Sequence, residues 1–295
     1  MLAWGLDLGG TKIEAVVVDP NNPAKPIARK RIPTEAERGY QIIVENCARL
    51  INKTTEETDL PHPEFVGVGA PGAPDPSTGK MRNCNTVCLN GQPLPTDLQA
   101  VLNCDCRVTN DANCFALAEA KLGCAQDAHS VFGVILGTGV GGGIVINGEI
   151  VEGANGIAGE WGHIVGDPSG PKCYCGKIGC VETLISGPAL EKRFEGQTGQ
   201  KMSLQEIAAS NSPEEREVID YLCHQFGQSL AQVVNVLDPE VIVLGGGVGQ
   251  IPDLYQQGKQ SLLRNVFHSD PKISLRKPLL GDSAGVFGAA MLTKR

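Results

Sequence analysis

Residues 2–18 read LAWGLDLGGTKIEAVVV, with apolar and β-branched residues on both sides of the pair Gly9-Gly10. This pattern predicts two β-strands joined by a tight turn at the glycines. Residues 131–143, VFGVILGTGVGGG, repeat the order of apolar strand, Gly/Thr turn and glycine-rich strand. A third strand that ends in a glycine turn is predicted at 241–247, VIVLGGG. The recurrence favours two lobes built on one plan.

Helices are predicted between these strands. Apolar residues recur at helical spacing in residues 41–60, and further helices are predicted at 112–122 and around 225–237. Short buried strands are predicted at 65–70 and 107–109. Strands that alternate with helices are typical of an α/β fold, in which ligands bind at the carboxyl ends of the strands.

The composition excludes some classes of partner. The chain has 295 residues, 41% of them hydrophobic and 20% charged, with a net charge of −8. No basic run is longer than Arg29–Arg31, so we expect no nucleic-acid partner. No apolar stretch reaches the roughly 18 residues of a membrane span, and the N-terminus lacks the layout of a signal peptide. We therefore expect no membrane partner and a cytoplasmic location.

Cysteine is unexpectedly frequent for a protein of a reducing compartment. The chain has 11 Cys, of which six are scattered in the manner of small core residues, and Cys104 and Cys106 form a pair expected in or beside a strand. Clustered Cys residues instead indicate a metal site. One His and three Cys form such a cluster within about twenty residues, which leaves three interpretations open: a metal site, a redox site, or part of a substrate pocket. The four residues are His163, Cys173, Cys175 and Cys180.

The glycine turns are candidate phosphate sites. Glycine lets backbone N–H groups approach an anion without a Cβ in the way, while threonine and lysine add a hydroxyl and a positive charge. Neither GxxxxGK[ST] nor a GxGxxG turn that opens the first helix is present, so a P-loop and a Rossmann site are poorly supported. Each turn is equally well explained as a structural hairpin, but three of them favour a nucleotide held between two lobes. The candidates are Gly9, Gly10, Thr11, Lys12, Gly137, Thr138, Gly139, Gly245, Gly246 and Gly247.

Asp7 lies at the end of the first predicted strand, beside the first glycine turn. It has two interpretations. The carboxylate either accepts a hydrogen bond from the turn or binds Mg²⁺ through water.

Five motifs resemble the ROK family of bacterial sugar kinases. They are GLDLGGTK (5–12), NDANCFALAE (110–119), GVILGTGVGGG (133–143), GEWGH (159–163) and CYCGKIGCVE (173–182), and they follow the family's order. The resemblance implies the actin-like ATPase (ribonuclease H-like) fold, with two α/β lobes and an interlobe cleft. It also implies transfer of the γ-phosphoryl group of ATP to the 6-hydroxyl of a hexose, with Mg²⁺ as cofactor.

We expect an N-terminal lobe at residues 1–110 and a C-terminal lobe at 111–282, with a C-terminal helix at 283–295 that packs back on the first lobe. We also expect a homodimer. Some family members are repressors with a DNA-binding helix-turn-helix ahead of the kinase fold. Because this chain starts at the first strand, a non-catalytic sugar-sensing regulator is the weaker alternative.

The resemblance assigns roles to several residues. Asp111 is the carboxylate that the family uses as catalytic base, although the sequence fits a helix N-cap equally well. Asn110, Glu160, His163 and Glu182 stand at the family's sugar-binding positions. Gly5 and Gly133, which lie inside the glycine-turn motifs, join the turn residues as expected nucleotide ligands.

The Cys/His cluster fits structural zinc once the family is considered. Cys173 and Cys175 are two residues apart, so in an extended chain their thiolates point the same way, and Cys180 and His163 complete a closed tetrahedral set. A redox role fits less well because the motif is not Cys-x-x-Cys. Zinc on one ring nitrogen of His163 would leave the other to donate to a sugar hydroxyl. We therefore predict that the cluster is both a Zn²⁺ site and a wall of the sugar pocket.

The identity of the sugar is predicted from residues 83–93, NCNTVCLNGQP. This segment, with GEWGH and CYCGK, is more similar to ROK fructokinases and mannokinases than to N-acetylglucosamine kinases. Asn83, Asn85 and Asn90 are short amides that can line a pocket or cap turns. We expect fructose as substrate, with mannose or glucose weaker and N-acetylglucosamine as the alternative. Only nine residues separate His163 from Cys173, a shorter loop than in some relatives, so specificity does not carry over from any one of them.

Overall fold

A computed structural model of the protein describes residues 2–23 and 25–294, which form two compact units. The first unit takes the chain as far as Gln126, together with Gly148–Ala158 and the segment from Leu279 onward; the second comprises Asp127–Asn147 and Gly159–Pro278. The predicted boundary at residue 110 differs from this division. Helix α3 (Asp111–Lys121) packs against β4, β7 and α10 of the first unit, so the chain leaves that unit only after α3.

The first unit is built on a five-stranded sheet with the order β3-β2-β1-β4-β7. Strands β1 and β2 are the antiparallel hairpin predicted around Gly9-Gly10, while β4 and β7 run parallel to β1. The strands are β1 (Ala3–Leu8), β2 (Lys12–Val18), β3 (Ala28–Pro33), β4 (Phe65–Ala70) and β7 (Asp105–Asn110). The remaining elements of this unit are η1 (Ala36–Arg38), α1 (Tyr40–Thr58), β5 (Ala73–Pro74), β6 (Met81–Arg82), η2 (Val87–Leu89), α2 (Leu94–Leu102), α3, β10 (Glu149–Ile150), η5 (Gly281–Ser283) and α10 (Ala284–Ala290).

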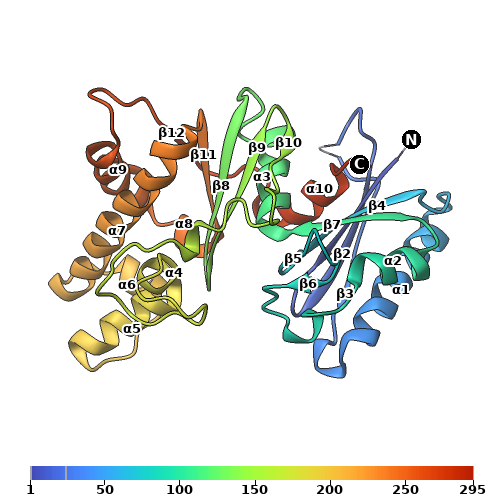
Figure 1. Ribbon diagram of the computed structural model, residues 1–295, viewed down its shortest axis with the longest axis horizontal. Coiled ribbons are helices and arrows are strands. Elements are labelled where there is room, and N and C mark those ends of the chain that lie inside the picture. The colour runs from blue at the N-terminus through green and yellow to red at the C-terminus, as the bar shows by residue number, and fades with distance from the viewer. Residues whose placement is uncertain (1, 24, 295) are drawn as a thin grey trace. The chain divides into compact units, whose positions relative to one another are not determined.

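The second unit repeats the plan. Its strands β9, β8, β11 and β12 are neighbours in that order, with β8–β9 antiparallel and β8–β11–β12 parallel (Figure 1). They are β8 (Ser130–Leu136), β9 (Val140–Ile146), β11 (Val241–Gly245) and β12 (Ser274–Arg276). The helices are η3 (Trp161–His163), α4 (Glu182–Ile185), α5 (Gly187–Thr198), α6 (Leu204–Ala209), α7 (Pro213–Leu237), α8 (Gly246–Gly249), the π-helix η4 (Leu254–Gly258) and α9 (Lys259–Asn265). A hairpin followed by parallel strands in both units confirms the predicted α/β class.

Helix α10 packs directly on the first sheet because the residues that face its backbone are glycines, which have no side chain. It packs on β1, β4 and α3. A Cβ on Gly5 or on Gly67 would collide with the backbone of α10, and a Cβ on Gly288 would collide with the backbone of α3 at Cys114. Only glycine permits such close approach of two backbones. Residue 295, the last of the predicted C-terminal helix, lies outside the described residues.

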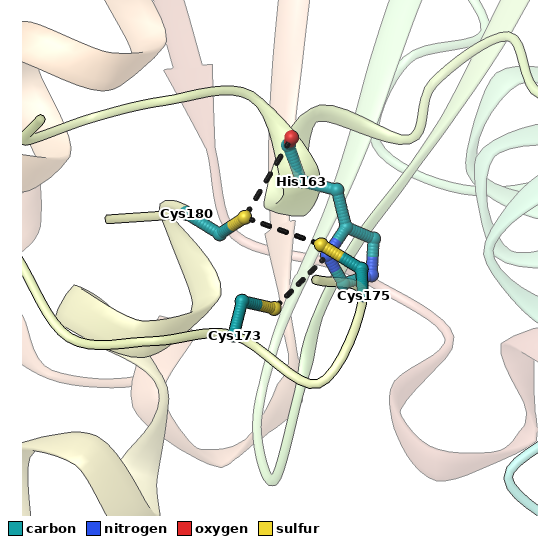
Figure 2. Close-up of side chains that lie close together, drawn as sticks. All are labelled: His163, Cys173, Cys175 and Cys180. Atoms are coloured by element: carbon teal, nitrogen blue, oxygen red, sulfur yellow. Dashed lines mark hydrogen bonds between the residues drawn. The ribbon is translucent and has the colours of Figure 1, made fainter. Parts of the chain in front are cut away.

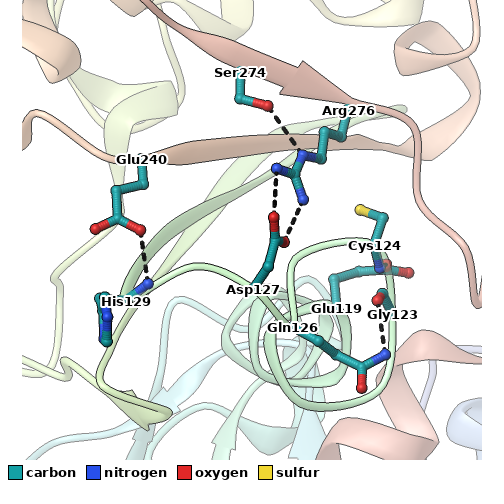
Figure 3. A network of polar contacts seen from close by, with 9 residues as sticks. All are labelled: Glu119, Gly123, Cys124, Gln126, Asp127, His129, Glu240, Ser274 and Arg276. Carbon is teal, nitrogen blue, oxygen red and sulfur yellow. Dashed lines mark hydrogen bonds and ion pairs between the residues drawn. The ribbon is translucent and has the colours of Figure 1, made fainter.

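A buried carboxylate in the first unit, Glu119, and an ion-paired one in the second, Asp127, each bond to a distant segment of the chain; Figure 3 draws both, together with Arg276. In the first unit Glu119 is fully buried and accepts backbone N–H bonds from Cys124 at 2.9 Å, Leu279 at 3.1 Å and Leu280 at 3.0 Å. In the second unit Asp127 accepts two bonds from the Arg276 guanidinium, at 2.5 and 3.1 Å. Each carboxylate thus joins segments that are far apart in the chain.

None of the described helices combines the length and the apolar character that crossing a bilayer requires.

Candidate functional site

The first unit brings polar residues to the carboxyl edge of its parallel strands. Asp7 in β1 is paired in register with Gly69 in β4, and Gly69 with Thr109 in β7, so Asp7 and Asp111 lie at the same edge. Burial raises the pKa of Asp7 to about 6, helped by the negative charges of Asp111 and Glu14 and opposed by Lys12 and Arg31. A pair of carboxylates at one strand edge suits a divalent cation held through water.

Asn110, rather than Asp111, is the N-cap of α3. The side-chain oxygen of Asn110 accepts a bond from the Ala112 N–H at 2.8 Å. Asp111 is the first helical residue, and its Oδ1 also accepts from the Ala112 N–H at 2.8 Å. The cap interpretation of Asp111 is therefore wrong.

In the first glycine turn, some of the backbone groups already have hydrogen-bond partners within the protein. The Gly9 N–H donates to the Lys12 carbonyl at 3.0 Å, and the Thr34 hydroxyl donates to the Gly9 carbonyl at 2.7 Å. Gly10, Thr11 and Lys12 are exposed at the tip. Since the Gly9 N–H already has a partner, an anion at this turn would bind to the polar groups of the exposed residues at the tip.

The second glycine turn, between β8 and β9, is built in the same way. The Gly137 N–H donates to the Gly139 carbonyl at 2.9 Å, and the Gly137 carbonyl accepts from the Gly187 N–H at 2.8 Å, at the start of α5. Thr138 is exposed at the tip. Gly133 lies buried inside β8, in register with Gly143, as Gly5 lies inside β1. Gly5 lies against the backbone of α10 and Gly133 is buried within its sheet, so we leave both out of the proposed nucleotide site.

A cavity of about 690 Å³ opens beside this turn in the second unit. That volume lies in the range of small-molecule sites. Three predicted nucleotide residues, Gly137, Thr138 and Gly247, line it together with residues of α5 and α6 that the sequence did not suggest. Gly245 is the buried last residue of β11, and Gly246 has φ +80° with a backbone that lies against Leu136. The other lining residues are Gly187, Pro188, Glu191, Ser203, Leu204, Gln205, Ala208, Ala209, Val248, Gln250, Ile251 and Pro252.

Glu182 connects α4 to the second glycine turn. Its Oε2 accepts a bond from the Val140 N–H at 3.0 Å, and a Cβ on Gly139 would lie only 2.7 Å from the same oxygen. A side chain at position 139 would therefore displace the Glu182 carboxylate, which accepts the bond from the Val140 N–H. This proximity links two motifs that are more than forty positions apart in the sequence.

Trp161 anchors the segment that carries Glu160 and His163. Its indole N–H donates to the Gly141 carbonyl at 2.8 Å, and its ring meets Phe132 edge-on with ring centroids 6.1 Å apart. Glu160 and His163 flank this buried indole and are themselves half-buried. Trp161 thus holds the GEWGH segment, which carries these two polar residues, against β9.

The predicted metal ligands come together in the second unit (Figure 2). The candidate ligand atoms of His163, Cys173, Cys175 and Cys180 all lie within 4.8 Å of one another. The Cys173 sulfur lies 3.6 Å from His163 Nδ1, and the sulfurs of Cys175 and Cys180 lie 3.5 Å apart. Zn–S bonds of about 2.3 Å in a tetrahedron place the sulfurs about 3.8 Å apart. The residues therefore fit a tetrahedral zinc ion.

The loop that holds the cysteines is fixed by its backbone. The Cys173 N–H donates to the Lys177 carbonyl at 2.8 Å, and the Gly176 N–H donates to the Cys173 carbonyl at 3.0 Å. Gly176 at φ +92° and Gly179 at φ +69° turn the chain between Cys175 and Cys180. Glycine is favoured there because other residues are strained at positive φ.

The position of Tyr174 in the structure was not predicted from its place in the sequence. Its hydroxyl lies 3.0 Å from His163 Nε2, and the two rings meet edge-on at 5.2 Å. Although the side chain as a whole is 76% exposed, desolvation of its hydroxyl raises the pKa of Tyr174 to about 12, with the negative charges of Glu182 and Glu160 among the further causes. The ring nitrogen that was expected to donate to a sugar thus already has a partner. Tyr174 thus contacts one predicted sugar ligand of this unit, His163.

Residues 83–93, on which the choice of sugar rested, include a structural asparagine. The Asn90 amide both accepts from the Cys84 N–H at 2.9 Å and donates to the Cys84 carbonyl at 3.0 Å. Asn83 has φ 56° and is exposed. Asn90 therefore stabilises a turn, which is the second of the two roles that the sequence allowed for it.

Replacing Asp7 by asparagine is expected to change the pH dependence of stability. The pKa of Asp7 is about 6 in the folded state against an ordinary 3.8, so its contribution to stability is complete below the ordinary value and is lost as the pH rises through about 6. Asp7→Asn, which stays neutral, should melt a few degrees above the wild type near pH 8 in magnesium-free buffer, and the difference should shrink towards pH 5. Scanning fluorimetry measures it, with Asp19→Asn as control. Equal melting temperatures near pH 8 would contradict the raised pKa.

The similarity of this chain to known proteins extends over both units. A profile of the ROK family matches residues 3–295. An N-acetyl-D-glucosamine kinase from Yersinia enterocolitica is 35% identical over 308 residues, which cover 98% of this chain and 98% of the relative. A ROK hexokinase from Thermus thermophilus superposes with a TM-score of 0.89 at 32% identity, covering 99% of this chain and 97% of that one. A ROK glucokinase from Streptomyces griseus, solved with glucose and AMPPNP, superposes with a TM-score of 0.80 at 29% identity, covering 98% of both chains.

Proposed function

Because the chain belongs to the ROK family and is a sugar kinase, we propose that it transfers the γ-phosphoryl group of ATP to the 6-hydroxyl of a hexose, with N-acetyl-D-glucosamine as the first candidate. One observation carries the proposed chemistry. Asp111 begins α3 at the carboxyl edge of the parallel strands, and its charge contributes to the raised pKa of Asp7. The two carboxylates are thus close enough to interact at the edge where ligands of α/β proteins bind.

Asp111 is the proposed catalytic base. A sugar hydroxyl is a weak nucleophile, so a carboxylate must accept its proton as the bond to phosphorus forms. The rest of the reaction depends on positioning and on the stabilisation of charge. Because Asn110 is the N-cap of α3, Asp111 is not required for capping.

Asp7 is the proposed partner of the ATP-bound Mg²⁺. Magnesium neutralises charge on the transferred phosphoryl group when it is bound. With a pKa of about 6, the Asp7 carboxylate is mostly ionised at neutral pH and can hold the water shell of such an ion. The exposed tips of the two glycine turns, with Lys12 in the first, are the proposed phosphate ligands.

The cavity beside Gly137, Thr138 and Gly247 is the proposed place of the nucleoside. Its size of about 690 Å³ and its lining by α5 and α6 support this assignment.

The sugar hydroxyls are the proposed partners of Asn110, Glu160, His163 and Glu182. Carboxylates and amides bind hydroxyls because they accept or donate in fixed directions. The Cys/His cluster would hold zinc, which supplies orientation and no open coordination site for substrate. With Nδ1 facing the cysteine sulfurs, the ring of His163 is fixed from one side.

Two observations favour N-acetyl-D-glucosamine over fructose. The curated relatives at 35% identity are N-acetyl-D-glucosamine kinases, and they match along 98% of this chain. Asn90, one of three amides in the segment that favoured fructose, is engaged with the Cys84 backbone. Fructose, mannose and glucose remain the comparison substrates.

A coupled assay that follows ADP formation tests the choice of sugar. We expect kcat/KM for N-acetyl-D-glucosamine to exceed that for fructose by at least tenfold, because a site built for particular hydroxyls discriminates strongly against a different arrangement. Glucose and mannose are measured at the same ATP and Mg²⁺ concentrations. A higher kcat/KM for fructose would restore the assignment made from residues 83–93. Sugar binding without turnover of any hexose would instead support the sugar-sensing regulator.

We also propose that the protein is a homodimer, as the family resemblance implies. Light scattering during gel filtration measures the mass directly against the 31.1 kDa of one chain.

A further inference from the structure

Three charged residues form one row across the first sheet. Glu14 in β2 is paired in register with Asp7 in β1 on one side and with Arg31 in β3 on the other. Residues directly opposite one another in antiparallel strands point to the same face, with Cβ atoms about 5 Å apart. Lys12 lies on that face too, because alternate residues of a strand share a face. Arg31 is therefore on the same face of the sheet as Asp7 and Lys12, the proposed partners of magnesium and phosphate.

Glu14 is the buried centre of this row. Its side chain is only 1% exposed, and a buried carboxylate is costly unless positive groups surround it. Two arginines of β3 supply them: Arg31 Nε lies 2.7 Å from Glu14 Oε2 in an ion pair, and Arg29 Nε donates to Glu14 Oε1. Each oxygen of the carboxylate thus holds one arginine by its Nε atom.

The two arginines differ at the ends of their side chains. Arg29 donates from Nη2 to the Ser283 hydroxyl in η5, so it ties β3 to the C-terminal segment. The side chain of Arg31 is 43% exposed, and its two terminal nitrogens form no hydrogen bond or ion pair within the described part of the chain. A guanidinium fixed through Nε can bind an anion with these nitrogens, because their fork matches the oxygens of a phosphate.

We propose that Arg31 is a further phosphate ligand of the kinase site, and that Glu14 is the residue that positions it. The inference rests on the proposed function, since the ligand is the β- and γ-phosphates of an ATP bound at the Gly9-Gly10 turn. Phosphoryl transfer is accelerated by fixed positive charges around the transferred group. Arg31 adds one such charge to that of Lys12, and its ion pair with Glu14 fixes the guanidinium before the nucleotide binds.

Arg31→Gln tests this because glutamine places its amide nitrogen where Arg31 has Nε and removes only the charged fork beyond it. Titration calorimetry gives the Kd for AMPPNP with Mg²⁺ and, separately, the Kd for AMP, which lacks the two outer phosphates. We expect the Kd for AMPPNP to rise about ten- to a hundredfold, the usual effect of losing a charged hydrogen bond. The Kd for AMP and the KM for sugar should change less than about twofold.

Glu14→Gln tests the positioning role through a double-mutant cycle. It should raise the Kd for AMPPNP about three- to tenfold in the wild type and have no further effect on this Kd in Arg31→Gln, because a positioning residue acts only through the residue that it holds. Lys30→Gln is the matched control. It also removes one positive charge from β3, but Lys30 lies on the opposite face of the strand and pairs with Glu57, so both Kd values should stay unchanged.

The comparison of the two nucleotides decides the inference. Equal rises in Kd for AMPPNP and AMP in Arg31→Gln would show that Arg31 only supports the fold, and unchanged values would show that the outer phosphates bind elsewhere; either result overturns the inference. An equal effect of Glu14→Gln in both backgrounds overturns its positioning role. A wild type that phosphorylates no hexose overturns the proposed function and with it this inference, whereas normal turnover with an unaffected Arg31→Gln overturns the inference alone.

Discussion

Asp111→Asn is expected to lower kcat at least a hundredfold. The amide preserves the shape of the side chain and can still accept the Ala112 N–H bond that Asp111 makes at 2.8 Å, but it cannot take the proton of the sugar hydroxyl. General base catalysis typically contributes a factor of about 10²–10⁴. The start of α3 should stay intact because its cap is Asn110. The Kd for sugar should therefore change less than about threefold, so that the loss appears in kcat.

Asp105→Asn is the matched control, since Asp105 begins the same strand β7 and its partner is Lys294 at 2.8 Å. It removes a carboxylate at the opposite end of the strand and should keep wild-type turnover. The coupled ADP assay measures both variants, and titration calorimetry measures sugar binding. A loss of less than tenfold in Asp111→Asn would show that another group accepts the proton.

Cys175→Ala is expected to remove zinc and to weaken sugar binding at the same time. Cys175 is exposed, so the substitution leaves no cavity in the core and its effects report on the metal. A structural zinc contributes binding energy to folding, and three ligands hold it far less firmly than four. We expect about one zinc per chain in the wild type and less than about 0.2 in the variant, a melting temperature lower by roughly 5–10 °C, and a KM for sugar raised about tenfold.

Metal analysis by mass spectrometry after dialysis against chelator, scanning fluorimetry and the coupled assay give the three readouts. Cys88→Ala, a half-buried Cys outside the cluster, is the control and should leave all three unchanged. A metal-free wild type with full stability and activity would exclude the zinc proposal. The Cys/His set would then be a packed cluster of thiols.

The parts of the fold that were predicted from sequence are those with strong local patterns. The strand predicted at 65–70 is β4 at Phe65–Ala70, and the helix predicted at 41–60 is α1 at Tyr40–Thr58. Helix α7 begins at Pro213, twelve residues before the predicted 225. Its first half was missed because that half is rich in charged residues and is buried on one face only. Charged residues hide an amphipathic pattern when a helix is half-exposed.

The candidate site was predictable where its residues share a motif. The Cys/His cluster lies within one stretch of sequence, and the local turns at Gly176 and Gly179 are enough to bring its ligands together. The contact between Gly139 and Glu182 and the cavity walls in α5 and α6 were not predictable, since they depend on tertiary packing. Tyr174 was missed for another reason: nothing in its sequence position shows that its side chain folds back over His163.

The three backbone bonds that Glu119 accepts have a consequence for how the protein is made. Two of them come from Leu279 and Leu280, which the ribosome adds only after the entire second unit. Until then the glycine-lined faces of β1 and β4 lack α10, and Glu119 has no backbone donors from the C-terminal segment. Contacts between residues so distant in sequence form slowly, because a long loop must close first. The unit that carries Asp111 is thus synthesised first but completed last, and the nascent chain exposes an unfinished apolar sheet throughout most of translation.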